Sequence, residues 1–349
     1  MFRYKTLTLV LVVTASLFVH SQSLAQAYTF ALELNNPDLI THVSGYNGTG
    51  GNLNITVGID QTSVNAVEAQ VSVANAVNTW NRLNATTNNI QFGEIGASEF
   101  DFESVLLHEL GHSLGLAHPN IGGGGPGSEF TQACVGFNGM HDLDAGADGI
   151  AGSSDDIRGD DINFNYFQIG VNDPFAAVPS VVDFTTFSND LADLPDGHTF
   201  SANGSREVAA ALGLANTESV LQQGTFAGET QRTLAAPDVV GILLAASGLD
   251  EIQGTDDDYT YTLEFVGLTD GADILIDFDN NQTGFAVAQS EGMLFNEDIN
   301  HASITTSDIF FNSNVNWFFN QVSNVPEPGS VFVLTLATVC LLNRRRRQS

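Results

Sequence analysis

The first hundred residues alternate between strand-like and helix-like spacing of apolar positions. Residues 28–34 (YTFALEL) and 52–59 (NLNITVGI) alternate or run apolar in the manner of strands, and the glycine-rich residues 44–51 between them have the composition of a loop. In residues 65–84 apolar side chains recur at helical spacing, at Val67, Val71, Ala74, Val77 and Trp80. This spacing predicts an amphipathic helix packed on a sheet.

A second helix is predicted at residues 101–116 (DFESVLLHELGHSLGL), after a strand at residues 88–95 (NNIQFGEI). Asp101 or Ser98 is placed to cap its N-terminus, and the helix must end near Gly115. Strand, helix, strand and second helix in this order indicate an α+β fold.

From Pro119 the chain becomes rich in glycine and acidic residues. Residues 119 to about 215 contain few periodic segments beyond the strand-like residues 162–169, so they are predicted to form a long insertion. Helical patterns follow at residues 206–214 and 236–249.

Beyond residue 255 the chain is rich in short strands separated by Asp, Asn and Gly turns, at residues 259–268, 273–278 and 284–289. This pattern predicts a small β-rich C-terminal region at residues 251–325, appended to a domain at residues 28–250.

The charge of the chain is strongly acidic. Between residues 28 and 326 there are 40 acidic residues, the 41 of the chain less Glu327, against four arginines, a formal charge of 4 − 40 = −36. Such a surface repels nucleic acid and attracts cations, although solubility in salty or extracellular surroundings explains it equally well. The two cysteines are Cys134 and Cys340, and Cys340 lies in the C-terminal targeting segment described next, so the mature chain would keep one thiol and form no internal disulfide.

Both ends of the chain have the composition of targeting segments. Residues 1–27 combine a basic start, an apolar run and small residues before the expected cleavage point, which predicts a secretory signal peptide, with a retained membrane anchor as the alternative. Residues 326–349 join Pro-Glu-Pro to an apolar segment, residues 331–342, and four arginines. This order resembles the PEP-CTERM sorting signal of Gram-negative bacteria, and an ordinary tail anchor is the alternative.

The resemblance to PEP-CTERM implies an exosortase-type sorting machinery as a partner and only transient contact with the membrane through the C-terminal segment. It also implies export to the periplasm, the cell surface or the extracellular matrix.

The pattern HExxHxxGxxH occurs in residues 108–118. On a helix, His108 and His112 project from one face one turn apart and can share a metal ion. Gly115 allows the chain to turn back, so that His118 can supply a third ligand. Three imidazoles leave a fourth position of zinc for water, and Glu109 is placed to take a proton from that water.

This segment resembles the active-site helix of the metzincin metalloproteases, and of the matrixins among them. The likeness extends back to residues 74–83 (ANAVNTWNRL), which are similar to the first helix of that family. It implies a twisted mixed sheet with long helices, one catalytic zinc ion on His108, His112 and His118, and Glu109 as general base. No cysteine precedes the motif, so latency through a pro-segment cysteine is not expected.

Metzincins carry a methionine turn beneath the zinc, and two positions compete for it here. Met140 follows His118 at a plausible distance, but the residues around it do not resemble those that follow the methionine turn in the family. Residues 218–249 are similar to the matrixin ending over some thirty residues, and on that alignment Leu221 occupies the methionine position. Leu221 is preferred, and because leucine and methionine are similar in volume, no chemical group is lost.

Two acidic loops share the pattern D-x-I-x-G-[S/T]-x-D-D, and clustered carboxylates in glycine-containing turns suit Ca²⁺. Neither loop matches an EF-hand, and solvated acidic turns are the alternative. The remaining histidines with no ligand-spaced partner, His141, His198 and His301, are expected to be ordinary surface or packed side chains. The candidate calcium ligands are Asp148, Asp155 and Asp156 in the first loop and Asp250, Asp256, Asp257 and Asp258 in the second.

The function expected from these features is that of an exported zinc endopeptidase, which hydrolyses peptide or protein substrates by Glu-assisted attack of zinc-bound water. The alternative is a non-catalytic metal-binding protein of the cell surface or matrix on a metzincin fold. Glu109 favours the enzyme, because a binding module needs no base beside its ligands.

Overall fold

The computed structural model describes the part of the chain that holds the motif and most of the predicted elements. The described residues are 11–12, 29–31, 39–118, 143–144, 147, 157–158, 166–167, 175, 181–188, 206–211, 213–222, 224–278, 284–296 and 299–324.

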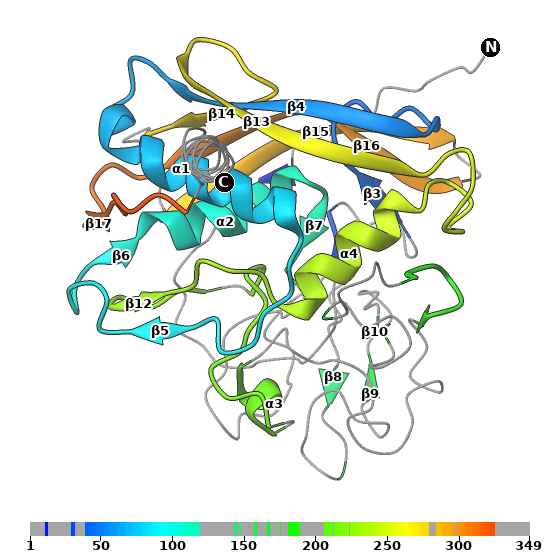
Figure 1. Cartoon of the computed structure of the whole chain (residues 1–349), viewed down its shortest axis with the longest axis horizontal. Coiled ribbons are helices and arrows are strands. Elements are labelled where there is room, and N and C mark those ends of the chain that lie inside the picture. The colour runs from blue at the N-terminus through cyan, green and yellow to red at the C-terminus, as the bar shows by residue number, and fades with distance from the viewer. Residues whose placement is uncertain are drawn as a thin grey trace, which may run out of the picture.

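A single mixed sheet of seven strands forms the frame of the described structure (Figure 1). The strand order is β1-β15-β16-β14-β4-β13, with β3 also paired to β16. Pairing is parallel except where β15 runs antiparallel to β16 and β1, so the sheet is mostly parallel. The strands are β1 (Leu11–Val12), β3 (Ile40–His42), β4 (Gly51–Asp60), β13 (Tyr259–Thr269), β14 (Ile274–Asp277), β15 (Ala286–Asn296) and β16 (Ile299–Phe311).

The predicted C-terminal β-rich region is not a separate appendage. Strand β4 lies between β13 and β14, two strands that follow it by some two hundred residues. Ile55, Val57 and Ile59 of β4 are buried, so the backbone of this strand has to be paired on both sides within the sheet. The C-terminal strands provide that pairing and complete the main sheet.

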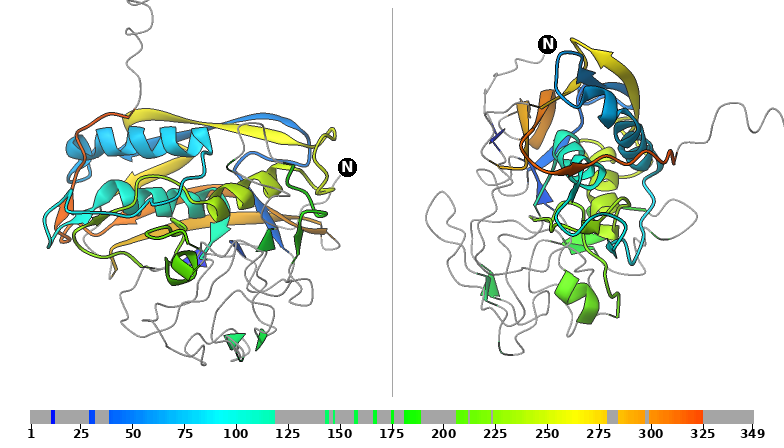
Figure 2. Two further views of the ribbon diagram at one scale, coloured as in Figure 1. Left: turned by 60° about the horizontal axis from the view of Figure 1, so that its bottom comes forward. Right: turned by 90° about the vertical axis from the view of Figure 1, so that its left-hand side faces the viewer.

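Few helices accompany the sheet, as expected for an α+β arrangement. Helix α1 (Ala66–Arg82) packs on β4 and β13, α2 (Phe102–Ser113) packs on β15 and β16, and α4 (Ala236–Ala246) packs near β3. Strands and helices form two layers, and α3 (Arg206–Ala211) lies beyond α2, away from β4 (Figure 2). Within the described residues, no helix is long and apolar enough to cross a bilayer.

The first predicted helix is confirmed as α1, and of its predicted apolar positions Val77 and Trp80 are buried whereas Val67 is exposed. Val67 is 66% exposed, whereas small side chains of the same helix are fully buried, at Ala66, Ala69 and Ala76. These alanines allow close approach to the sheet and to α2, and they share the buried face with larger side chains such as Val73 and Val77. Trp80 is buried with them, and its Nε1 donates a hydrogen bond to the carbonyl oxygen of Leu107 at 2.9 Å.

Five further ladders have two residues on each strand, and of their ten strands only β2, β5 and β10 were predicted. They are β2 (Thr29–Phe30) with β7 (Leu116–Ala117), β5 (Gln91–Phe92) with β12 (Glu229–Thr230), β6 (Phe100–Asp101) with β17 (Trp317–Phe318), β8 (Leu143–Asp144) with β9 (Ile157–Arg158), and β10 (Tyr166–Phe167) with β11 (Phe187–Ser188).

The predicted targeting segments lie mostly outside the described residues. Of residues 1–27 the structure describes β1 alone, which pairs with β15 at Ser290 and Gln289. The predicted sorting tag at residues 326–349 lies wholly outside them, and so do Cys134 and Cys340.

Candidate metal centre

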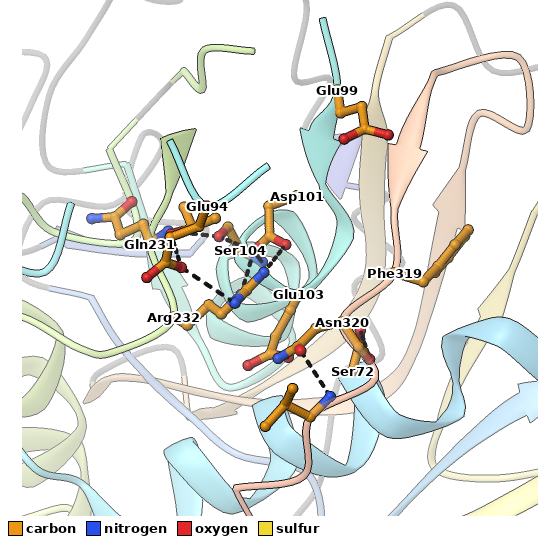
Figure 3. A network of polar contacts seen from close by, with 12 residues as sticks. Ser72, Glu94, Glu99, Asp101, Glu103, Ser104, Gln231, Arg232, Phe319 and Asn320 are labelled. Carbon is orange, nitrogen blue, oxygen red and sulfur yellow. Dashed lines mark hydrogen bonds and ion pairs between the residues drawn. The ribbon is translucent and has the colours of Figure 1, made fainter. Parts of the chain in front are cut away.

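Helix α2 begins at Asp101, one of the two caps that the sequence offers. The Oδ2 atom of Asp101 accepts a hydrogen bond from the backbone N–H of Ser104 at 3.0 Å, which satisfies a donor of the first turn. Arg232 holds this carboxylate through a 2.6 Å contact between Nη2 and Oδ1 (Figure 3). The cap and its arginine therefore fix where the motif-bearing helix starts.

The helix ends where the sequence predicts, and glycine is required there. Gly115 has φ +102°, in the left-handed region, and a Cβ atom at this position would lie 2.5 Å from the carbonyl oxygen of Thr41 in β3. The carbonyl oxygen of Gly115 accepts a hydrogen bond from the N–H of Ala31 at 2.8 Å. The chain then enters β7 and returns toward α2, so that His118 comes beside the helix.

The three motif histidines converge on one point. The Nε2 atoms of His108 and His112 are 3.0 Å apart, and that of His118 lies 3.1 Å from each of them. Among the described residues this is the one group of three or more His, Cys, Asp or Glu side chains that could hold a metal ion. The predicted ligand atoms are thus brought together by one turn of helix and one turn of loop.

The other ring nitrogen of two ligands is held by a backbone carbonyl. Nδ1 of His108 lies 2.7 Å from the carbonyl oxygen of Val220, and Nδ1 of His112 lies 2.9 Å from that of Leu116. A carbonyl only accepts, so each Nδ1 carries the hydrogen and each Nε2 presents a lone pair. Burial lowers the pKa of His108 to about 4 and that of His112 to about 3, and it lowers the pKa of His118 as well, so the rings are neutral near pH 7.

This donor set fits a transition-metal ion. With hydrogens on both Nδ1 atoms, the contact between Nε2 of His108 and Nε2 of His112 brings two lone pairs together at 3.0 Å, which a shared cation makes favourable. In a tetrahedral shell with each nitrogen about 2.0–2.1 Å from zinc, neighbouring nitrogens lie about 3.3 Å apart, close to the separations here. Zinc fits, and other divalent metals that prefer imidazole ligands fit as well.

Glu109 lies on the same helix with a buried carboxylate. Neither oxygen of this side chain has a hydrogen-bond partner among the described residues. Burial raises its pKa to about 8; the backbone N–H of Ala288 in β15 opposes the shift without reaching hydrogen-bonding geometry. An orphaned buried carboxylate on the helix that carries two of the convergent imidazoles requires a polar partner, and a water molecule or a bound substrate can provide one.

Leu221 packs against α2. It lies in the turn of residues 219–222, whose Val220 carbonyl contacts His108. It is buried, and a Cβ atom on Gly111 would lie 2.6 Å from its Cδ2. Val220, the residue before it, supplies the carbonyl that contacts His108. Leu221 therefore lies against the helix that carries His108 and His112, whereas the alternative, Met140, lies outside the described residues.

The same turn is held by Asp238 of α4, a residue that the sequence analysis missed. Its carboxylate accepts hydrogen bonds from the hydroxyl of Ser219 and from the backbone N–H groups of Val220 at 3.1 Å and Leu221 at 3.4 Å. Burial raises its pKa to about 6, which these hydrogen bonds oppose. A carboxylate inside the apolar run APDVVGILLAA was the sequence signal that could have found it, because a buried acid requires partners.

The second predicted calcium loop does not form a metal-ligand cluster. Its carboxylates accept hydrogen bonds from donors of the same loop: Asp257 from the N–H of Leu249 at 2.6 Å, and Asp258 from the N–H of Gly254 at 2.5 Å. Asp250 likewise accepts from the N–H of Ile252 at 2.9 Å. Asp256 joins no ligand group among the described residues, and its carbonyl accepts from the N–H of Gly50.

Of the other predicted positions, most lie outside the described residues and one, His301, is described. Asp148, Asp155 and Asp156 of the first acidic loop, with His141 and His198, lie outside the described residues. His301 is a packed histidine, as expected: it is buried, and its Nδ1 lies 2.8 Å from Nε2 of His42.

Comparison with known proteins adds no relative: no protein-family model, no curated protein and no solved structure matches this chain.

Proposed function

We propose that this protein is a zinc-dependent endopeptidase of metzincin type. The observation that carries the proposal is the convergence of three imidazole Nε2 atoms, 3.0–3.1 Å apart, two of them from the helix that also bears the unpartnered carboxylate of Glu109. The signal peptide and the sorting tag expected from the sequence make it an exported enzyme in this proposal.

His108, His112 and His118 would hold the ion, and the carbonyls of Val220 and Leu116 orient two of the rings. When bound in such a site, zinc acts as a Lewis acid that polarises a carbonyl group and makes water acidic enough to react near neutral pH.

Glu109 contributes the proton transfer. Its carboxylate takes the proton that the attacking water loses and delivers it to the amine that leaves when the peptide bond breaks. A raised pKa suits both halves of that exchange, since the group then gains and loses a proton near neutral pH.

The test measures zinc content and peptide cleavage on the same preparations of the full chain. Wild type, Glu109→Gln and His112→Ala are compared, with metal measured by mass spectrometry and cleavage measured on a mixed peptide library. We expect one zinc ion in the wild type and in Glu109→Gln, cleavage by the wild type alone, and loss of metal in His112→Ala. Zinc in the wild type without cleavage of any peptide would favour the non-catalytic metal-binding protein.

A further inference from the structure

The loop of residues 219–228 begins in contact with the metal centre. At its start, the carbonyl of Val220 contacts Nδ1 of His108 and Leu221 packs on Gly111. At its far end the chain enters β12, which pairs with β5. The position of this loop therefore determines whether His108 keeps its tautomer and orientation.

A buried glutamate flanks each end of the loop, and both meet one guanidinium group. Arg206 donates to Glu218 from Nε and Nη2, each at 2.8 Å. The same side chain donates to Glu229 from Nη1 at 3.1 Å and from Nη2 at 3.2 Å. Arg206, Glu218 and Glu229 together are called the clamp below.

The burial of the two glutamates and the geometry of the guanidinium make the clamp specific for arginine. The side chains of Glu218 and Glu229 are 2% and 7% exposed, so their charges are screened little by water and depend on the arginine. All four carboxylate oxygens are engaged by the planar fork, a geometry that lysine cannot reproduce. Glu229 also accepts from the N–H of Phe226 at 3.2 Å, and Arg206 lies 5.2 Å from the centre of the Phe226 ring.

Arg206 belongs to α3, at the end of the stretch that the sequence marks as an insertion. Glu218 is two residues from Val220. A displacement of Glu218 therefore shifts the Val220 carbonyl that contacts His108. Arg206 thus links α3 to the segment that contacts His108.

We propose that Arg206 is a positioning residue for the metal centre. The clamp holds the two ends of the loop together, and this keeps the Val220 carbonyl in contact with Nδ1 of His108. The inference rests on the proposed metal site of this protein and not on peptide cleavage. Outer hydrogen bonds of this kind orient metal-bound histidines and tune the affinity of the site.

The test compares the full-chain wild type with Arg206→Ala, Arg206→Lys and the triple variant R206A/E218Q/E229Q. The triple variant removes the two stranded charges, so it recovers folding stability while the clamp stays absent. Arg82→Ala is the control, because Arg82 is an exposed arginine that donates to the carbonyl oxygen of Asn324 at 3.2 Å and contacts neither the clamp nor α2 in that bond. Zinc affinity is measured by competition with a chelator, and loop order is measured by amide hydrogen exchange of residues 219–228.

We expect Arg206→Ala and the triple variant to bind zinc about 10-fold more weakly or worse, the usual cost of losing an outer partner of a metal ligand. Exchange in residues 219–228 should accelerate in both, and Arg206→Lys should shift in the same direction. In the control, zinc affinity and loop exchange should stay at the wild-type values.

Unchanged zinc affinity and loop exchange in the triple variant would overturn the inference and leave the clamp a purely structural contact. Zinc binding by the wild type without cleavage of any peptide would sink the proposed protease and leave this test intact, so the two failures are distinguishable.

Discussion

The side-chain amide of Asn320 donates a hydrogen bond to Oε2 of Glu103 at 2.8 Å, and this contact joins the last described segment of the chain to the helix that carries His108 and His112 (Figure 3). Asn75 of α1 donates to the same oxygen at 2.9 Å. A carboxylate in the first turn of α2 therefore gathers two amides from segments far apart in the sequence.

The Glu103 contact predicts a pH dependence of stability. Burial raises the pKa of Glu103 to about 7, which the amides of Asn75 and Asn320 oppose. Because the folded-state pKa is raised above the unfolded value, the fold favours the protonated acid, and stability decreases as the pH rises from about 4.5 to about 7. Relative to Glu103→Gln, the wild type should lose on the order of 2–3 kcal/mol across that range.

Urea unfolding of both proteins at pH 4.5, 6 and 8 checks this expectation. Other carboxylates titrate in both proteins alike, so the difference between them isolates position 103. A constant difference across the pH range would show that Glu103 is not protonated in the folded protein.

Gly115→Ala should damage the metal centre severely. The new Cβ would lie 2.5 Å from the carbonyl of Thr41, and φ is +102°. Gly45→Ala is the control, since its φ is +87° and a Cβ there meets nothing within 4 Å. Both variants carry backbone strain of about 1–3 kcal/mol, so only the collision and the shift of His118 differ. Zinc content and melting temperature should fall well below the control in Gly115→Ala, and equal values would contradict the role assigned to this turn.

Asp238→Asn should loosen the turn that carries Val220 and Leu221. The new amide would place a donor where the structure has donors from Ser219, Val220 and Leu221, at a cost of about 1–3 kcal/mol. Zinc affinity should fall with stability, because the Val220 carbonyl moves with the turn. Asp270→Asn, at an exposed position directly after β13, serves as the control in the same unfolding and metal-binding assays.

Leu221→Met tests whether leucine in this turn lowers the rate of peptide cleavage. Both side chains are similar in volume, so the change should cost less than about 1.5 kcal/mol and leave zinc content intact. Leu221→Ala would open a cavity against Gly111 and should cost about 2–5 kcal/mol. Peptide cleavage by Leu221→Met well above that of the wild type would identify the leucine as a handicap, and equal rates would show that packing alone is required.

The sequence by itself determined the local part of the metal centre. A four-residue spacing places His108 and His112 on one face of any helix, Asp101 caps it, and Gly115 permits the turn that returns His118, because each of these relations spans a few residues and follows from backbone geometry. The helices α1, α2 and α4 and the strands β4, β13 and β14 were predicted for the same reason.

The tertiary structure alone decided the long-range relations. Strand order cannot be read from alternation, so the position of β4 between β13 and β14 was missed, and burial against neighbours decided that Val67 of α1 stays exposed while Val77 is covered. The carbonyl of Val220 reaches His108 across 112 residues, and Asp238 and Arg206 hold its turn from two other helices. Such partners depend on which surfaces pack together, and packing is a property of the whole chain that no local pattern encodes.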